Sequence, residues 1–358
     1  MFSASKIGRT GRLPGVTPAR LRGIELKKLG RCSVASYAQA FGSLPGAPCD
    51  IKGITGPFDD VLARFALFFF PETSLAMDYV KPAEVVETMV VAGGTKGSLP
   101  AKDLLIRGIL SGALLGFSTS LAVTATVQTN VPLAGALIFP TGFVMIVLLG
   151  LELATGSFAL LPLAVSDHKL STTRMLTNFG WVLLGNLIGS LLYAVLLAGA
   201  LTMCGQSPDA SGTAAKIVAI AQAKTTGYAK FGAAGLGRVF IKAILCNWMV
   251  TLGVVMGMTS RSTVGKIIAA WLPIFVFFAQ GFEHSIVNMF VIPAGILLGA
   301  KVSVADWWIW NQIPVTIGNF VGGALFTGFA LYWTYKPRST SSTAVAQQEP
   351  AAEPHLAR

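Results

Sequence analysis

Two glutamates and one histidine lie well inside long apolar runs of the sequence, where a charge is costly. Glu152 and Glu283 are the only carboxylates there, and His284 is the only histidine. Such residues are functional by default, because burying them without partners is strongly unfavourable. A histidine donates a hydrogen bond while neutral and gains a proton at a pH of about 6.5, so His284 is suited to bind a small anion. A histidine satisfied only by loop carbonyls is the alternative interpretation.

The composition is that of a membrane protein. Of the 358 residues, 53% are hydrophobic and 12% are charged, and the mean hydropathy is +0.66. These values exclude a soluble enzyme with a polar surface. Residues 1–50 hold 8 basic and 2 acidic residues, which is +6 of the net charge of +11, so no nucleic-acid-binding face is expected elsewhere. The four cysteines lack metal-ligand spacing, and neither a metal nor a cofactor is expected.

The apolar runs are long enough to cross a lipid bilayer six times, which predicts an all-α membrane protein. Two of the six runs are interrupted, the second and the fifth. The expected spans cover residues 104–127, 133–151 with 156–165, 176–203, 238–259, 266–282 with 285–299, and 309–334.

The sequence repeats itself at a spacing of 131 to 135 residues. The matching pairs are Ile106–Leu110 with Ile241–Leu245, Glu152 with Glu283, and Gly185–Gly189 with Gly318–Gly322. Each copy holds three spans, so the second copy enters the membrane in the opposite direction, and the fold class is two inverted three-helix repeats. Both interruptions fall at the same place in their copy, which is the best sequence indication of a transport site. The two breaks are therefore expected to face each other across a pore.

Five polar residues are expected to support the two breaks. Glu152 and Glu283 each precede a break, where backbone N–H groups of the next half-helix need acceptors, so we interpret both as bracing the loops, with contact to a substrate as the alternative. Asn186 and Asn319 each lie in a Gly-Asn-x-x-Gly motif, which suits close helix packing and a hydrogen bond between helices. Asn247 is expected to be buried and to brace a loop.

Residues beside the breaks are candidates for the pore lining. Thr155 and Ser285 offer hydroxyls at the two breaks, with simple N-capping as the alternative. Phe139, Phe143 and Phe277 lie in the half-helices that lead into the breaks. Inward-pointing rings would form apolar constrictions that exclude hydrated ions, whereas lipid-facing rings fit the spacing equally well.

Basic residues in the connections indicate the orientation. Most of them lie on the side that holds both termini, so the positive-inside rule places the termini in the cytoplasm or, in a plastid, in the stroma. Lys224 and Lys230 lie on the opposite side, before the fourth span. A lysine at a pore mouth concentrates anions, and a solvated loop lysine is the alternative.

The ends of the chain differ in composition from the spans. The N-terminus is rich in Arg, Ser, Gly and Ala, which is typical of a transit peptide, with a plastid favoured over a mitochondrion. A disordered basic tail on the cytosolic side is the alternative. A helix starting at Pro82 and stopped by Gly93-Gly94 is amphipathic and is expected to lie along the membrane surface. The expected organisation is a transit peptide at 1–48, an amphipathic N-terminal segment at 49–100, a transmembrane transport domain at 101–336 and a disordered tail at 337–358.

Four strings of residues resemble the signatures of the formate/nitrite transporter family. They are Leu151–Gly156, Ile244–Trp248, Gly281–Met289 and Ile313–Asn319. The Phe-Glu-His-Ser-Ile and Leu-Cys-Asn strings are highly specific together, and the resemblance runs from about Pro82 to Trp333.

The resemblance implies an aquaporin-like fold, a homopentamer with one pore per protomer, and transport of small monovalent anions such as formate, nitrite or bicarbonate. It makes His284 the central selectivity residue and places Thr155 in the loop opposite. The implied apolar constrictions are Phe139, Phe143, Leu153 and Phe277. The pore-mouth lysine of the family matches Lys224 by its Ala-x-Ala-Lys context or Lys230 by its spacing from Asn247.

A plastid-targeted member resembles the green-algal envelope branch of the family. Nitrite is reduced in plastids, so nitrite import through the chloroplast inner envelope is the leading hypothesis, with a bicarbonate channel second and another organelle or the plasma membrane as alternative locations. An intramembrane enzyme is disfavoured because neither His-Glu-x-x-His nor Gly-x-Ser-x-Gly occurs. A neutral-solute channel is disfavoured because no Asn-Pro-Ala lies at either break.

Overall fold

The computed structural model describes residues 78–209 and 211–336, so the expected transit peptide and C-terminal tail lie outside the described residues. The described part is helical, and its single β pairing is an isolated bridge between Tyr79 and Ser260. Two of its helices precede spans: α3 (Pro82–Gly97) and α10 (Thr213–Lys224), the latter followed by the single turn α11 (Thr226–Ala229).

Four of the six predicted spans are long apolar helices. They are α4 (Ala101–Thr129), α9 (Thr172–Leu201), α12 (Gly232–Met258) and the composite helix Val304–Tyr335. The composite helix consists of α15 (Val304–Trp307), η2 (Trp308–Gln312), α16 (Ile313–Val321), η3 (Gly322–Phe329) and α17 (Ala330–Tyr335). Its two π-helical stretches widen the backbone spiral, a feature that is frequent at functional sites.

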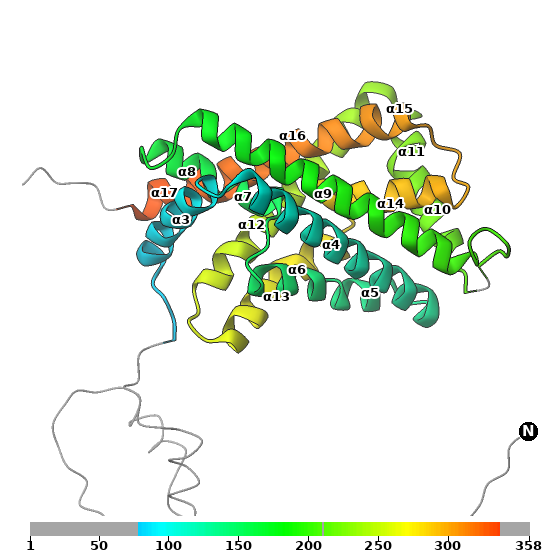
Figure 1. Cartoon of the computed structure of the whole chain (residues 1–358), viewed down its shortest axis with the longest axis horizontal. Coiled ribbons are helices and arrows are strands. Elements are labelled where there is room, and N and C mark those ends of the chain that lie inside the picture. Colours follow the sequence, from blue (N-terminus) through cyan, green and yellow to red (C-terminus); the bar gives the residue numbers. More distant parts are fainter. Residues whose placement is uncertain (1–77, 210, 337–358) are drawn as a thin grey trace, which may run out of the picture. The chain divides into compact units, whose positions relative to one another are not determined.

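The other two spans are broken where the sequence predicted. The first consists of α5 (Pro132–Ile138) and α6 (Pro140–Leu148), followed after the break by α7 (Ala154–Ser157) and α8 (Leu161–Ser166). The second consists of α13 (Thr263–Ala279) and α14 (Ser285–Leu297). In Figure 1 the first broken span runs from α5 on the right to α8 on the left, and the second runs from α13 toward α14 on the right. Their opposite directions confirm the inverted arrangement.

Matching glycines make the helix crossings of the two repeats equivalent. A Cβ added to Gly189 of α9 would lie 1.9 Å from the backbone oxygen of Ile109 in α4. A Cβ added to Gly322 would lie 2.3 Å from the backbone oxygen of Ile244 in α12. Only glycine permits either approach, so α4 with α9 and α12 with the composite helix form the same close contact in both repeats.

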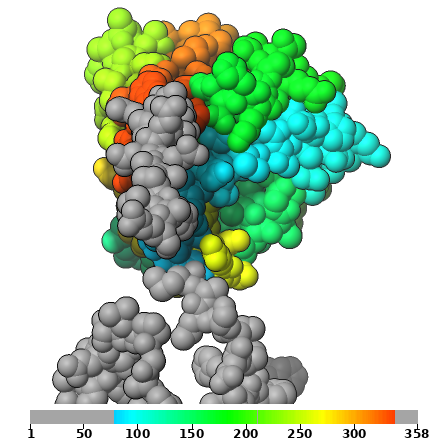
Figure 2. Space-filling model, turned by 90° about the vertical axis from the view of Figure 1, so that its left-hand side faces the viewer, coloured from blue at the N-terminus to red at the C-terminus, as the bar shows by residue number. Residues whose placement is uncertain are grey.

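Helix α3 packs against the protein, and Gly93-Gly94 does not end it. Val85, Val86 and Met89 are buried in a cluster with the apolar side chains of α8, and the helix continues to Gly97. Gly93 lies against the backbone of Leu160, where an added Cβ would be 2.3 Å from the carbonyl oxygen. The glycine therefore serves close packing rather than chain reversal. Both α3 (blue) and α17 (red), which contact each other, reach the face shown in Figure 2.

A substitution at Gly93 tests this packing. Gly93→Ala is expected to displace α3 from α8 and lower the free energy of unfolding by about 2 kcal/mol, since the new methyl group overlaps a backbone carbonyl. The neighbouring Gly94→Ala provides the control, because its Cβ would lie 3.7 Å from the nearest atom, in ordinary contact. Thermal unfolding of purified protein in detergent measures both, and equal midpoints for the two variants would contradict the proposed contact.

Candidate functional site

An asparagine side chain holds the first break. Asn186 of α9 donates its amide hydrogens to the carbonyl oxygens of Glu152 (3.0 Å) and Gly108 (2.9 Å). Its Oδ1 accepts the backbone N–H of Ala154 at 3.1 Å. One buried amide thus satisfies the backbone on both sides of residue 153 and ties the break to α4.

The second break repeats this arrangement. Asn319 donates to the carbonyl oxygens of Glu283 (2.9 Å) and Ala243 (2.8 Å), and its Oδ1 accepts the N–H of Ser285 at 2.8 Å. Leu153 and His284 therefore occupy equivalent positions, each held between two backbone hydrogen bonds to one asparagine. The two breaks differ at this position, because one carries an apolar side chain and the other an imidazole.

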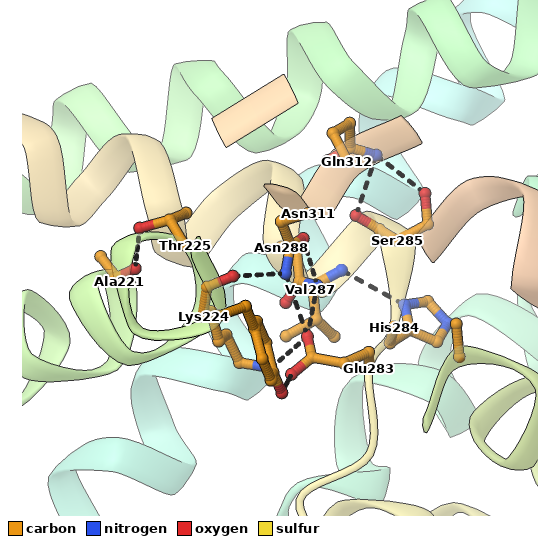
Figure 3. A network of polar contacts seen from close by, with 12 residues as sticks. Ala221, Lys224, Thr225, Glu283, His284, Ser285, Val287, Asn288, Asn311 and Gln312 are labelled. Atoms are coloured by element: carbon orange, nitrogen blue, oxygen red, sulfur yellow. Dashed lines mark hydrogen bonds and ion pairs between the residues drawn. The ribbon is translucent and has the colours of Figure 1, made fainter. Parts of the chain in front are cut away.

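The Glu283 carboxylate is buried among four hydrogen-bond donors (Figure 3). Lys224 contacts Oε2 at 2.7 Å, and the hydroxyl of Tyr228 donates to Oε1 at 2.7 Å. The amides of Asn288 and Asn311 donate to Oε2 at 2.9 Å and 3.3 Å. A buried carboxylate is tolerated only when its charge is paired and its lone pairs are used, and both conditions hold here.

Glu152 has the corresponding lysine but fewer other partners. Lys96, in the last turn of α3, contacts its Oε1 at 2.7 Å. The sequence predicts that both glutamates brace the next half-helix; in the described residues the asparagine side chains take that role, and the carboxylates bind lysines. The carboxylates bind lysines because a buried negative charge must be paired with a positive one. A backbone N–H group is neutral and can be satisfied by the amide oxygen of an asparagine.

His284 is buried between the two breaks, with both ring nitrogens engaged. Its Nδ1 accepts the backbone N–H of Val287 at 3.2 Å. In the neutral ring the proton therefore lies on Nε2, which is 3.1 Å from Oγ1 of Thr155. The ring also stacks on Phe277, with centroids 5.7 Å apart. The geometry presents His284 as a neutral donor that faces the opposite break.

Asn247 and Ser285, both close to this histidine, differ in what their side chains contact. Asn247 donates to the carbonyl oxygens of Thr155 (3.1 Å) and Asn319 (2.7 Å), so it links the first break to the composite helix. The hydroxyl of Ser285 instead lies 2.8 Å from that of Thr316 and accepts from the Gln312 amide at 2.9 Å. Its hydrogen bonds are therefore directed toward the composite helix.

Two cavities approach the centre from opposite sides. A cavity of about 650 Å³ is lined by Lys96, Phe143 and Leu153 among others. A second cavity of about 320 Å³ is lined by Lys224, Phe277 and His284 among others. The two have no lining residue in common: Leu153 of the first break lines the larger cavity, and His284, at the equivalent position of the second break, lines the smaller one.

Two of the predicted pore residues, Phe139 and Lys230, lie outside both cavities. Phe139 lines neither cavity; it is fully buried and packs edge-on against Phe277, with centroids 5.6 Å apart. Lys230 is exposed and lines neither cavity, whereas Lys224 lines the smaller one.

Several site residues were not identified from the sequence. Asn288 and Asn311 were missed, although Asn178 and Asn311 are separated by the repeat spacing. Lys242 was noted only as part of the repeat, yet it lines the smaller cavity. Lys96 was overlooked as the partner of Glu152, because two charges 56 residues apart carry no local signal.

Six spans in two inverted repeats, with two broken spans meeting at a polar centre, define a membrane transporter. A sequence profile described as formate/nitrite transporter matches residues 83–333, and the chain belongs to this family. Its members are transporters and channels, so the chain is a membrane transporter and not an enzyme. The predicted family is confirmed, and the plastid branch stays a prediction.

Relatives extend over nearly the whole described region. The uncharacterized transporter YrhG of Bacillus subtilis is 35% identical over 279 residues, covering 76% of this chain and 99% of that protein. The formate channel BtFdhC of Bacillus thuringiensis is 34% identical over 275 residues, covering 74% and 99%. A solved structure described as a pentameric formate channel with formate bound superposes with a TM-score of 0.54 at 26% identity, covering 66% of this chain and 97% of that chain.

Proposed function

We propose that the chain carries small monovalent anions across a membrane, with formate as the first substrate. One observation carries the proposal: His284 lines the smaller of two lysine-lined cavities, and its Nε2 faces Thr155 of the opposite break at 3.1 Å. The lysines attract an anion, and the imidazole offers it a hydrogen bond where water is excluded. Relatives named as formate channels support the choice of formate.

The hydrogen bonds of His284 define its role. Because Nδ1 is occupied by the N–H of Val287, a second ring proton would break that bond and place two N–H groups against each other. The ring therefore acts as a fixed neutral donor through Nε2, and an arriving anion replaces Thr155 as its acceptor. A proton that accompanies the anion is supplied from the solution rather than from an imidazolium.

Reconstitution in liposomes tests the proposal. Purified protein is expected to accelerate uptake of formate, with nitrite and bicarbonate as parallel substrates, at pH 5.5 and 7.5. Faster uptake at the lower pH would indicate that the anion crosses together with a proton. Uptake of all three substrates at the rate of protein-free liposomes would overturn the proposed function.

We also propose that the chain forms a pentamer in the chloroplast inner envelope and imports nitrite, with bicarbonate as the alternative substrate. The pentameric relative supports the assembly, and the basic N-terminal composition supports the location. Mass measurement of the detergent-purified protein checks the first, and a fluorescent fusion to the full chain checks the second. A monomeric mass or a signal outside plastids would refute the respective proposal.

A further inference from the structure

The smaller cavity is lined by a second lysine, Lys242, in addition to Lys224. Glu283, the carboxylate of this cavity, forms its salt bridge with Lys224 and not with Lys242. Lys242 lies on α12 and lines this cavity together with Lys224, Glu283 and His284. The charge of Lys224 is already compensated by Glu283 at 2.7 Å. In residues 78–209 and 211–336, no carboxylate lies within salt-bridge distance of Lys242.

The backbone fixes Lys242 beside the second break. Its carbonyl oxygen accepts the N–H of Glu283 at 3.3 Å, so the ammonium group extends from a point attached to the break itself. Arg238, one turn earlier on α12, is exposed and does not line the cavity. Lys242 therefore supplies the uncompensated positive charge of this cavity, at the side of the pore that carries the imidazole.

The first repeat lacks this feature. Its equivalent residue, Arg107, lies 3.8 Å from Asp103 on the same helix and lines neither cavity. The position equivalent to Lys242 therefore places no cation in the larger cavity, whose lysines are Lys96 and, from α13, Lys266. An unpaired charge within a membrane span is costly, and the usual reason for keeping one is a ligand.

We propose that Lys242 is the anion-capture group of the smaller cavity, while Lys224 serves to neutralise Glu283. This assignment rests on the proposed anion transport. It makes Lys242 a positioning residue that raises the local concentration of the anion next to His284 without itself forming the constriction. Removing its charge should therefore change apparent affinity more than maximal rate.

Initial rates of formate uptake into liposomes, measured over a range of formate concentrations, test the assignment. Lys242→Gln is expected to raise the half-saturating concentration on the order of tenfold with little loss of maximal rate, and Lys242→Arg to stay near wild type. Added non-transported salt should weaken apparent affinity in the wild type more than in Lys242→Gln. The matched control is Lys216→Gln, because Lys216 is an exposed lysine of α10 that lines neither cavity.

The outcomes separate this assignment from the proposed function. A Lys242→Gln half-saturation equal to that of an active wild type overturns the assignment, whereas an inactive wild type overturns anion transport itself. If Lys242→Gln does not assemble, Lys242→Met gives the same comparison with a side chain better suited to an apolar wall. An equal shift in Lys216→Gln would also overturn the assignment, because it would show a general surface-charge effect.

A second inference concerns the polar network around Glu152, which is the counterpart in the first repeat of the Glu283 network in Figure 3. In the second repeat the Asn288 amide donates to Glu283 Oε2 (2.9 Å) and to Asn311 Oδ1 (2.8 Å). Asn311 in turn donates to the backbone oxygen of Lys224 at 2.9 Å. One side-chain amide therefore bridges a carboxylate and a second amide.

In the first repeat the bridging side chain is too short. Asn178 donates to the backbone oxygen of Lys96 at 2.9 Å, as Asn311 does to that of Lys224, but Ser157 stands where the second repeat has Asn288. The atoms Glu152 Oε2, Ser157 Oγ and Asn178 Oδ1 are all buried without a hydrogen-bond partner in the described chain. Glu152 Oε2 and Asn178 Oδ1 can only accept hydrogen bonds, so a group that joins these two oxygens must donate two hydrogens.

We infer that a water molecule binds here, donating to Glu152 and Asn178 and accepting from Ser157. Ser157 and Lys96 both line the larger cavity, which gives water a path to the site. A high-resolution cryo-EM map of the wild type is expected to show a solvent peak between these three side chains, and a map of Ser157→Asn is expected to lack it. A wild-type map without the peak, or an unchanged peak in Ser157→Asn, would overturn the inference.

Discussion

Replacing His284 with leucine is expected to lower formate flux about thirtyfold. In the proposed mechanism the imidazole donates a hydrogen bond to the anion, and a hydrogen bond to a charged group is worth about 2 kcal/mol, which corresponds to that change in rate. Leucine suits the backbone, because Leu153 occupies the equivalent position in the first repeat and is held by the same pair of asparagine contacts. The variant should therefore fold and assemble while losing the polar group.

Thr155→Val provides the matched control for this prediction. It removes the hydroxyl that lies 3.1 Å from Nε2 but leaves the histidine, so flux should stay within about threefold of wild type. Both variants are compared in liposomes at pH 5.5 and 7.5 with equal amounts of protein. Wild-type flux in His284→Leu would remove the histidine from the transport mechanism, whereas an equal loss in both variants would indicate that the Thr155–His284 contact itself is required.

The breaks and their symmetry could be predicted because each produces a signal within a short stretch of sequence. A short interruption of an apolar run is visible without a partner, and the Gly-Asn-x-x-Gly motif appears in each copy at the repeat spacing. The role of the asparagines at the breaks was less accessible. Asn186 contacts residues 32 to 78 positions away, and nothing in its own motif distinguishes helix packing from bracing of a loop.

The lysine partners could not be predicted for a related reason. Lys96 precedes Glu152 by 56 residues and Lys224 precedes Glu283 by 59, so their spacing differs slightly between the copies and the match is not obvious. The sequence also does not distinguish Lys224 from Lys230, six residues later, as the pore-mouth lysine. Only the packing of α10 against α14 brings one of the two to Glu283 and leaves the other exposed.

The two carboxylates are equivalent in position but differ in support. Glu283 binds a lysine, a tyrosine hydroxyl and two amides. Within the described residues the Glu152 side chain binds Lys96 alone, and both lysines line a cavity, Lys96 the larger and Lys224 the smaller. The side chain of Lys96 is 25% exposed, against 18% for Lys224. Loss of the carboxylate charge should therefore be more damaging in the second repeat than in the first.

Glu283→Gln is expected to lower the free energy of unfolding by about 3 kcal/mol, because it leaves the largely buried charge of Lys224 without its carboxylate partner. Glu152→Gln should cost about 1 kcal/mol, since Lys96 is more accessible to water. Thermal unfolding in detergent compares the two variants with wild type.

The double variant Glu283→Gln/Lys224→Met separates the charge from the hydrogen bonds. It removes both members of the ion pair, so it should recover most of the stability that Glu283→Gln loses, as expected when an unpaired buried charge is the cause. A double variant no more stable than Glu283→Gln would instead assign the loss to the hydrogen bonds of Tyr228, Asn288 and Asn311 with the carboxylate. Equal losses in Glu283→Gln and Glu152→Gln would contradict the asymmetry of the two repeats.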